Sequence, residues 1–308
     1  MKRKVVIIGS GPAGLTAAIY TARAKLNPLV IEGNSPGGQL VTTTYIENWP
    51  GEKKILGAQL MNNIREHAKA YGAEIISDLA VNVDFSSQPY KIFTQSGKII
   101  ESDSVIIATG ASHRKLNIGG EKEYWGRGVG TCATCDGPFF AEQDVVIIGG
   151  GNTAVTEASF LCRFAKKITI IQNLETLSAN DPIKDEVLAD PKINVVYNSL
   201  AMEIVGDGQN VTGVKIKNQK DNSTSVIPAR GVFVAIGFKP NTEIFKNHLE
   251  VDSYGYLKLS GSTQTSKEGI FAAGDVADFK YMQAIVSSGF GCMAALDCEI
   301  YLRGKKKE

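Results

Sequence analysis

A glycine-rich motif of the type GxGxxG occurs twice in this chain, each time directly after a run of Val and Ile. The first copy is Gly9–Gly14, which follows Val5–Ile8, and the second is Gly149–Ala154, which follows Val145–Ile148. A turn of this kind between a buried strand and a helix presents backbone N–H groups to the phosphates of a dinucleotide. The sequence therefore predicts two dinucleotide-binding folds in one chain.

The residues around the first motif complete the pattern expected of such a fold. Leu15–Ala24 is rich in Ala and predicts a helix, an Asn-Pro pair ends it, and Leu29–Ile31 predicts a second buried strand. Glu32 follows that strand, where an acidic residue accepts hydrogen bonds from a ribose. The second copy has the same strand and helix pattern, but Gln172 occupies the position that corresponds to Glu32.

Two further segments predict that the second fold is inserted into the first. Ser104–Ala108 and Gly269–Asp275 each contain a short apolar strand that ends near a glycine, and Gln283–Leu302 predicts a long final helix. We expect an α/β protein with two Rossmann-like dinucleotide-binding domains, a pairing that suits hydride transfer between a flavin and a nicotinamide cofactor. The expected domains are residues 1–115 with 245–308 for the flavin, and residues 116–244 for the nicotinamide.

Composition narrows the range of partners. Lys and Arg number 33 against 32 Asp and Glu, so the near-neutral chain has no strong field for nucleic acid or an anionic membrane. The apolar run Val5–Ile8 is too short for a signal peptide or a membrane span, and we expect a cytoplasmic location. Five cysteines in such a chain indicate thiols that are kept reduced rather than a disulfide scaffold.

Two of these cysteines, Cys132 and Cys135, form a CxxC segment just before the strand of the second fold. This spacing permits a disulfide and lowers a thiol pKa, which indicates a redox-active dithiol. A zinc site would need two more ligands, but the chain has no second CxxC, and its three histidines are far apart in the sequence. We therefore expect a working disulfide and no metal.

Eight segments of the chain, in order, resemble those of low-molecular-weight thioredoxin reductases, and the resemblance extends from end to end. The segments are GSGPAG (9–14), SPGGQL (35–40), IENWPG (46–51), IIATGA (106–111), CATCDG (132–137), GGGNTA (149–154), FAAGDV (271–276) and GCMAALD (291–297).

The resemblance implies two sets of cofactor-binding residues. The set implied for FAD is Gly9, Gly11, Pro12, Ala13, Gly14, Glu32, Gly38, Gln39, Thr44, Asn48, Ala108, Thr109, Gly110, Gly274, Asp275, Gln283 and Ala284. The set implied for NADH or NADPH is Gly149, Gly151, Asn152, Thr153 and Ala154.

The resemblance also implies how the dithiol works. Cys135 would lie nearest the flavin, Cys132 would attack the disulfide of a thioredoxin-like protein, and Asp136 would act as general acid and base, as suits an acid next to a thiol. A homodimer, and a domain rotation that exposes the dithiol to flavin and to thioredoxin in turn, are implied in the same way.

The chain departs from the family at two positions that normally carry basic residues. Relatives that use NADPH have an HRRxxxR-like segment after the second strand of the second fold, whereas residues 172–178 here contain no Arg, Lys or His. Met282 also replaces a usual Arg. Gln172 can accept one hydrogen bond from a ribose, and Glu175 would repel a phosphate, so NADH is possible where NADPH is poor.

Three hypotheses fit this loss of basic groups. The chain could use a nicotinamide donor, with NADH preferred or NADPH bound weakly. It could instead take electrons from ferredoxin or another carrier, although the intact GGGNTA segment argues against that. It could also be a non-catalytic flavin-binding thiol sensor, against which the intact CATCDG segment argues.

Overall fold

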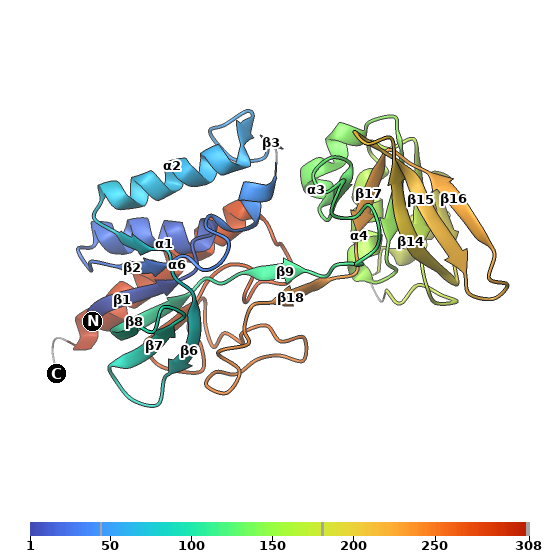
Figure 1. Ribbon diagram of the computed structural model, residues 1–308. Coiled ribbons are helices and arrows are strands. Elements are labelled where there is room, and N and C mark those ends of the chain that lie inside the picture. Colours follow the sequence, from blue (N-terminus) through green and yellow to red (C-terminus); the bar gives the residue numbers. More distant parts are fainter. Residues whose placement is uncertain (44, 180–181, 306–308) are drawn as a thin grey trace. The chain divides into compact units, whose positions relative to one another are not determined.

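The computed structural model describes residues 1–43, 45–179 and 182–305, and the chain divides into two compact units (Figure 1). Unit 1 is Met1–Ser112 with Lys239–Glu308, and unit 2 is His113–Phe238. From the sequence we expected these boundaries after residues 115 and 244. The two connections between the units, β9 (Ala111–His113) and β18 (Phe238–Pro240), pair with each other as a two-stranded sheet.

Unit 1 is built on a seven-stranded sheet of order β5-β2-β1-β8-β7-β6, with β19 paired to β8. The strands β5, β2, β1, β8 and β19 are parallel, and β7 and β6 continue the sheet antiparallel. Its strands are β1 (Lys2–Ile8), β2 (Leu29–Ile31), β5 (Glu74–Ile76), β6 (Ala80–Asp84), β7 (Tyr90–Thr94), β8 (Ile99–Ile107) and β19 (Ile270–Ala272). The remaining elements are α1 (Pro12–Arg23), the 3-10 helix η1 (Gly38–Thr42), the hairpin β3 (Tyr45–Ile46) and β4 (Ile55–Leu56), α2 (Gly57–Ala70) and α6 (Ala284–Gly304).

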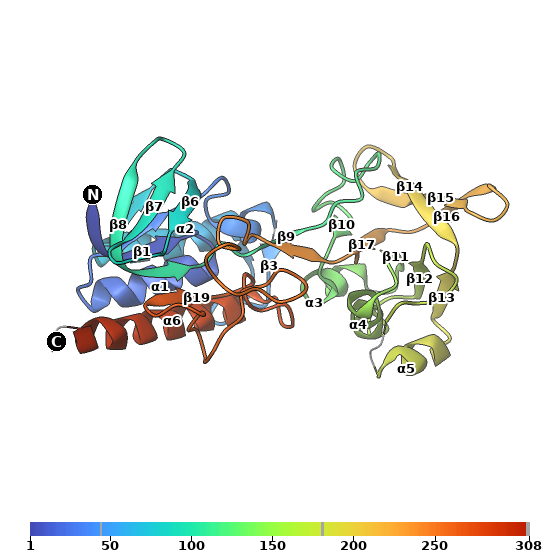
Figure 2. The same cartoon turned by 90° about the horizontal axis from the view of Figure 1, so that it is seen from below.

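Both faces of this sheet are buried, which explains the continuous apolar run in β1. Alternate residues of a strand point to opposite faces. Val5 and Ile7 pack with α1 and α6 on one face, while Val6 and Ile8 pack with a second apolar cluster on the other. Figures 1 and 2 both show α1 beside α6. β1 is thereby packed between two helices on one face and a second apolar cluster on the other.

Unit 2 repeats this plan on a smaller scale. Its parallel sheet has the order β10-β17-β11-β12-β13, and a separate antiparallel sheet has the order β14-β15-β16. The strands are β10 (Val129–Gly130), β11 (Asp144–Ile148), β12 (Lys167–Ile171), β13 (Ile193–Val196), β14 (Ser199–Gly206), β15 (Val211–Asn218), β16 (Thr224–Pro228) and β17 (Gly231–Val234). The helices are α3 (Ala133–Asp136), the 3-10 helix η2 (Gly137–Phe140), α4 (Asn152–Leu161) and α5 (Lys184–Ala189). One face of the parallel sheet packs on α3, α4 and α5, and the other packs on the antiparallel sheet.

Among the helices in the described part of the chain, α6 alone is long and apolar enough to cross a membrane. Ala294, Ala295 and Cys298 on this helix are buried in the same cluster as α1 and β1. The helix therefore forms part of the core of unit 1, and its apolar composition is explained by that packing.

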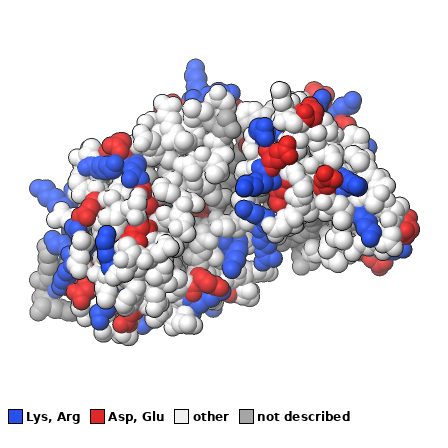
Figure 3. Space-filling model, in the orientation of Figure 1, with Lys and Arg blue, Asp and Glu red and all other residues white. Residues whose placement is uncertain are grey.

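Charged side chains of both signs are mixed over the face of the molecule seen in Figure 3. This mixing agrees with the near balance of charges in the sequence, a formal net charge of +1. No extended area of a single sign is visible on that face.

Candidate functional site

The turn between β1 and α1 in unit 1, Gly9–Gly14, leaves an open space at the start of the helix, which we call the cradle. Gly9 has a φ of +111°, and a Cβ added there would collide with the carbonyl oxygen of Ala108. A Cβ at Gly14 would collide with the carbonyl oxygen of Gly9. At Gly11, in contrast, the nearest atom to an added Cβ is the Gly38 Cα, 4.0 Å away. Gly11 is the N-cap of α1 and makes no side-chain capping bond, so this turn fits the pyrophosphate of a dinucleotide such as FAD.

Glu32 lies at the carboxyl end of β2, and its buried carboxylate is paired. Arg65 on α2 forms an ion pair with Oε1, and the Ser77 hydroxyl donates a hydrogen bond of 2.8 Å to Oε2. The Ser10 hydroxyl in the glycine turn donates to the Glu32 carbonyl at 3.2 Å. The carboxylate is thus held next to the cradle, where a ribose hydroxyl could reach it. Arg65 was not anticipated from the sequence.

The residues expected beside a flavin ring come from three segments of unit 1. Gly38 has a φ of +70°, and a Cβ there would lie 3.1 Å from the Gly11 Cα, so its loop closes over the cradle. The Gln39 Nε2 donates to the Ala111 carbonyl at 2.6 Å. The Asn48 side-chain amide donates to the Gln283 Oε1 at 3.5 Å. Thr44 lies outside the described residues.

The start of α6 packs on the same cradle. Gly274 has a φ of +79°, and a Cβ there would lie 3.0 Å from both the Ala13 Cβ and the Ser287 Oγ. The Ser287 hydroxyl donates to the Asp275 Oδ1 at 2.9 Å, and burial raises the pKa of Asp275 to about 6. Ala284 is the first residue of α6, so Asp275 and the start of this helix lie near the start of α1.

A second segment expected at the flavin follows β8. Ala108 is buried, and its N–H donates to the Ile8 carbonyl at 2.8 Å. The Thr109 hydroxyl donates to the Asn241 carbonyl at 2.8 Å, and the Asn241 N–H donates to the Gly110 carbonyl at 3.0 Å. Pro12, another residue of the set expected to bind FAD, is the first residue of α1.

The turn between β11 and α4 in unit 2 has the same design. Gly149 has a φ of +131°, and a Cβ there would collide with the Ala235 carbonyl oxygen. Gly151 is the N-cap of α4, with an extended φ of −87° and no side-chain capping bond. The nearest atom to a Cβ at Gly151 is the Ser178 Oγ, 3.9 Å away. Asn152, Thr153 and Ala154 form the first turn of the helix, so this turn could hold a second dinucleotide.

Gln172 is held by hydrogen bonds within the loop that follows β12. Its Nε2 donates to the Thr176 carbonyl at 2.9 Å, and its Oε1 accepts from the Asn173 N–H at 3.0 Å. The side chain lies over Gly150 and is 3% exposed. Gln172 therefore shapes the loop that follows β12.

A basic residue, Lys220, lies beside the loop that follows β12, although it comes from a distant part of the chain. The Lys220 Nζ, in the turn between β15 and β16, lies 2.8 Å from the Glu175 Oε1. The neighbouring Gln219 Nε2 donates to the Asn173 carbonyl at 2.6 Å. Lys220 lowers the pKa of Glu175, so the two side chains pair as opposite charges.

The two cysteines of the CxxC segment form a disulfide in unit 2, with their Cα atoms 5.3 Å apart. The Cys135 and Asp136 N–H groups donate to the Cys132 carbonyl at 3.2 and 3.0 Å, which closes the short helix α3. Burial raises the pKa of Asp136 to about 6. A carboxyl group with this pKa next to two sulfur atoms can exchange protons with thiols near neutral pH.

Glu157 is a second carboxyl group at this corner that the sequence did not single out. It lies on α4, which packs against α3, and its Oε2 accepts a hydrogen bond from the N–H of Ala133, the residue after Cys132. Burial is the main cause that raises the pKa of Glu157 to about 7. The hydrogen bond from the Ala133 N–H lowers this pKa in part, and the charge of Asp136 raises it again.

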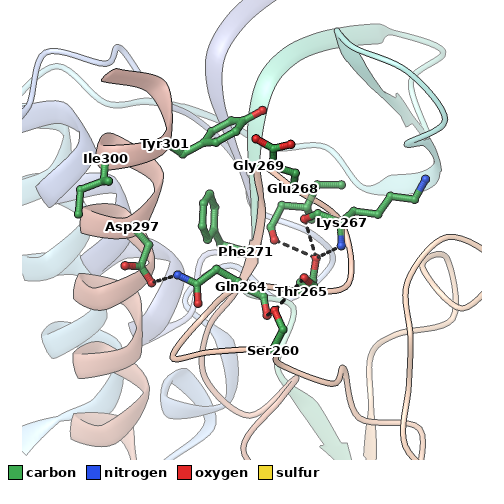
Figure 4. Close-up of a pocket in the computed structure, with 11 residues that line it drawn as sticks. Ser260, Gln264, Thr265, Lys267, Glu268, Gly269, Phe271, Asp297, Ile300 and Tyr301 are labelled. Atoms are coloured by element: carbon green, nitrogen blue, oxygen red, sulfur yellow. Dashed lines mark hydrogen bonds between the residues drawn. The ribbon is translucent and has the colours of Figure 1, made fainter. Parts of the chain in front are cut away.

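A surface pocket of about 390 Å³ lies elsewhere in unit 1, between α6 and the segment before β19 (Figure 4). None of the residues expected at the cofactor or the dithiol lines it. The Asp297 carboxylate accepts hydrogen bonds from the Thr263 hydroxyl and from the Gln264 amide, the latter at 3.1 Å. We assign no function to this pocket.

Comparison with known proteins identifies the relatives of this chain. A family model described as pyridine nucleotide-disulphide oxidoreductase matches residues 3–291. Thioredoxin reductase from Streptomyces coelicolor is 48% identical over 99% of this chain and 96% of its own. Thioredoxin reductase from Rickettsia typhi is 48% identical over 97% of this chain and 98% of its own. The solved structure of thioredoxin reductase from Giardia duodenalis is 40% identical, with a TM-score of 0.93 over 98% of this chain and 99% of that chain.

Proposed function

Because the chain belongs to the pyridine nucleotide-disulphide oxidoreductase family, we propose that it is a flavin-dependent thioredoxin reductase. The observation that carries this proposal is the Cys132–Cys135 disulfide, held beside the half-buried carboxyl of Asp136. The relatives that are 48% identical over nearly the whole chain are named thioredoxin reductases. No observation favours a non-catalytic thiol sensor.

The family uses FAD and a nicotinamide cofactor, and each unit has a turn that fits a dinucleotide. In unit 1 the cradle at Gly11, the Glu32 carboxylate and the residues around Asp275 would hold FAD. Bound FAD would supply the two-electron chemistry that connects a hydride donor to a disulfide. In unit 2 the turn at Gly151 would hold the pyrophosphate of the nicotinamide cofactor.

The dithiol transfers electrons to its partner by two exchange steps. The Cys132 thiolate attacks the partner disulfide, so that a mixed disulfide forms and one partner sulfur leaves and takes up a proton. The Cys135 sulfur loses its proton and attacks Cys132, which restores the Cys132–Cys135 disulfide and releases the second partner sulfur as a thiol. The partner gains two electrons from the dithiol, and its two released sulfurs take up two protons from solvent. Asp136 would accept the proton that Cys135 loses.

We propose that the nicotinamide donor is NADH. The loop after β12 offers no basic side chain of its own, and the carboxylate of Glu175 would repel the 2′-phosphate of NADPH. Lys220 could attract that phosphate, but it is already paired with Glu175. A ferredoxin-type carrier is the alternative donor, and the open turn at Gly151 is an argument against it.

Replacing Glu175 with Gln should shift the preference toward NADPH. The substitution removes a negative charge and frees Lys220 for the 2′-phosphate, so we expect the KM for NADPH to fall by about fivefold while that for NADH changes little. Steady-state reduction of oxidised thioredoxin with each donor measures both constants. Glu243→Gln, which breaks a similar exposed pair with Lys246, is the matched control. An unchanged KM ratio would show that this loop does not contact the adenosine ribose.

We further propose a cytoplasmic homodimer. Four exposed apolar side chains on α6 support the dimer, because their spacing places them on one face of the helix: Ile285, Met293, Leu296 and Ile300. Ile300 is 68% exposed. Sedimentation analysis of the parent protein and of Ile300→Lys tests the dimer. A parent with the mass of a dimer and a variant that shifts toward the mass of a monomer support it. A parent that sediments as a monomer contradicts it.

A further inference from the structure

The corner of unit 2 that carries the dithiol holds two carboxyl groups. Its elements are β10, α3, η2 and α4, and the charged residues on these elements are Asp136 and Glu157. Neither takes part in an ion pair among the described residues. The charged residues on α5, β11 and β12, which also pack against α4, are Lys184, Asp185, Glu186, Asp144 and Lys167. Once the disulfide is reduced, the sulfurs of Cys132 and Cys135 can exchange protons with Asp136 and Glu157.

Each carboxyl group is held by a specific contact. The Asp136 carboxylate packs over Gly130 of β10, where an added Cβ would lie 2.7 Å from its Oδ2. The Glu157 carboxylate reaches from α4 to accept the N–H of Ala133, between the two cysteines. Glu157 thus contacts the same short helix, α3 (Ala133–Asp136), that carries Cys135 and Asp136.

We propose that Glu157 is a positioning residue for the dithiol that also receives the proton which Asp136 takes from Cys135. This inference rests on the proposed function and extends it. When Cys135 attacks the mixed disulfide, its thiol proton passes to the Asp136 carboxylate. The proton then moves to Glu157, and Asp136 is ready for another transfer. No oxidant or reductant beyond the dithiol and its partner is needed for this step.

Burial raises the pKa of Asp136 to about 6 and that of Glu157 to about 7, so both carboxyl groups can gain and lose protons near neutral pH. Glu157 can receive the proton only when it is itself ionised. The contribution of Glu157 to the rate should therefore be absent below about pH 6 and should grow as the pH rises through about 7.

The test uses Glu157→Gln, because a Gln side chain can still accept the Ala133 N–H but cannot take up a proton. The FAD-loaded protein is reduced with dithiothreitol, freed of reductant, and mixed with 5,5′-dithiobis(2-nitrobenzoate), and the single-turnover rate is followed from pH 5.5 to 8.5. We expect the variant to match the parent near pH 5.5 and to be about tenfold slower above pH 8. Glu186→Gln, which removes an exposed carboxylate from α5, is the control and should follow the parent.

The outcomes separate this inference from the function on which it rests. If the reduced parent protein fails to reduce the reagent at any pH, the proposed disulfide chemistry fails. If the parent reacts and Glu157→Gln has the same pH profile, the proton role of Glu157 is wrong. A uniform loss at every pH in Glu157→Gln would also contradict it, since that result indicates a structural role only. Glu157→Ala, which removes the Ala133 contact as well, should lower the rate at every pH.

Discussion

Cys135→Ser abolishes disulfide reduction, lowering turnover of oxidised thioredoxin by a factor on the order of 10⁴ or more, while FAD remains bound. Without the Cys135 sulfur the mixed disulfide at Cys132 cannot be resolved, and the two-step exchange stops after its first step. The flavin cradle lies in unit 1, and Cys135 lies in unit 2, so flavin content should be unchanged. Turnover of thioredoxin and the flavin-to-protein ratio are the two measurements.

Cys162→Ser is the matched control for this substitution. Cys162 is also in unit 2, is free and half-buried, and has a pKa raised to about 11, chiefly by burial. The control should retain full turnover. If Cys135→Ser kept turnover, or if Cys162→Ser lost it, the dithiol would be assigned to the wrong residues.

Gly11→Ala and Gly151→Ala should have separable effects on the two cofactors. Each residue is an N-cap with an extended φ that Ala tolerates, −69° at Gly11 and −87° at Gly151. An added Cβ meets no protein atom closer than 4.0 Å at the first and 3.9 Å at the second. Each substitution therefore leaves the fold intact, at a cost of about 1 kcal/mol for the poorer cap, and occupies space expected for a pyrophosphate.

The expected results differ between the two variants. Gly11→Ala should weaken FAD binding by about 100-fold, so that the protein is purified largely without flavin. Gly151→Ala should keep its flavin but be reduced poorly by NADH, with a KM for NADH about 100-fold higher. Since both substitutions carry the same capping cost, each is the stability control for the other, and thermal unfolding measures that cost. Loss of flavin in Gly151→Ala, or unimpaired turnover with NADH, would contradict the assignment of the two turns.

The features that could be predicted from the sequence are those formed by neighbouring residues. The turn at Gly9–Gly14 follows from a buried strand, glycines at fixed spacing and a helix, all within one short segment. The same holds for Gly149–Ala154 and for the CxxC segment. The fold class was confirmed, since solved thioredoxin reductases match nearly the whole chain.

Contacts between distant residues could not be predicted in this way. Arg65 pairs with Glu32 across α2 and β2, and Lys220 reaches Glu175 from the β15–β16 turn, so neither pairing leaves a local pattern. Glu157 lies on α4 in a segment read only as a helix, and its position beside α3 depends on how the two helices pack. The hydrogen bonds of Gln172 could not be predicted for the same reason, because they depend on the path of the loop that follows it.

The most direct test of the proposed function is anaerobic mixing of the purified yellow protein with NADH and, separately, with NADPH, followed by oxidised thioredoxin. We expect NADH to bleach the flavin absorbance faster than NADPH, and thioredoxin to restore it with two new thiols for each disulfide added. Failure of both nicotinamides to bleach the flavin, with dithionite still delivering electrons to the dithiol, would contradict a nicotinamide donor. Bleaching that thioredoxin does not reverse would contradict thioredoxin reduction itself.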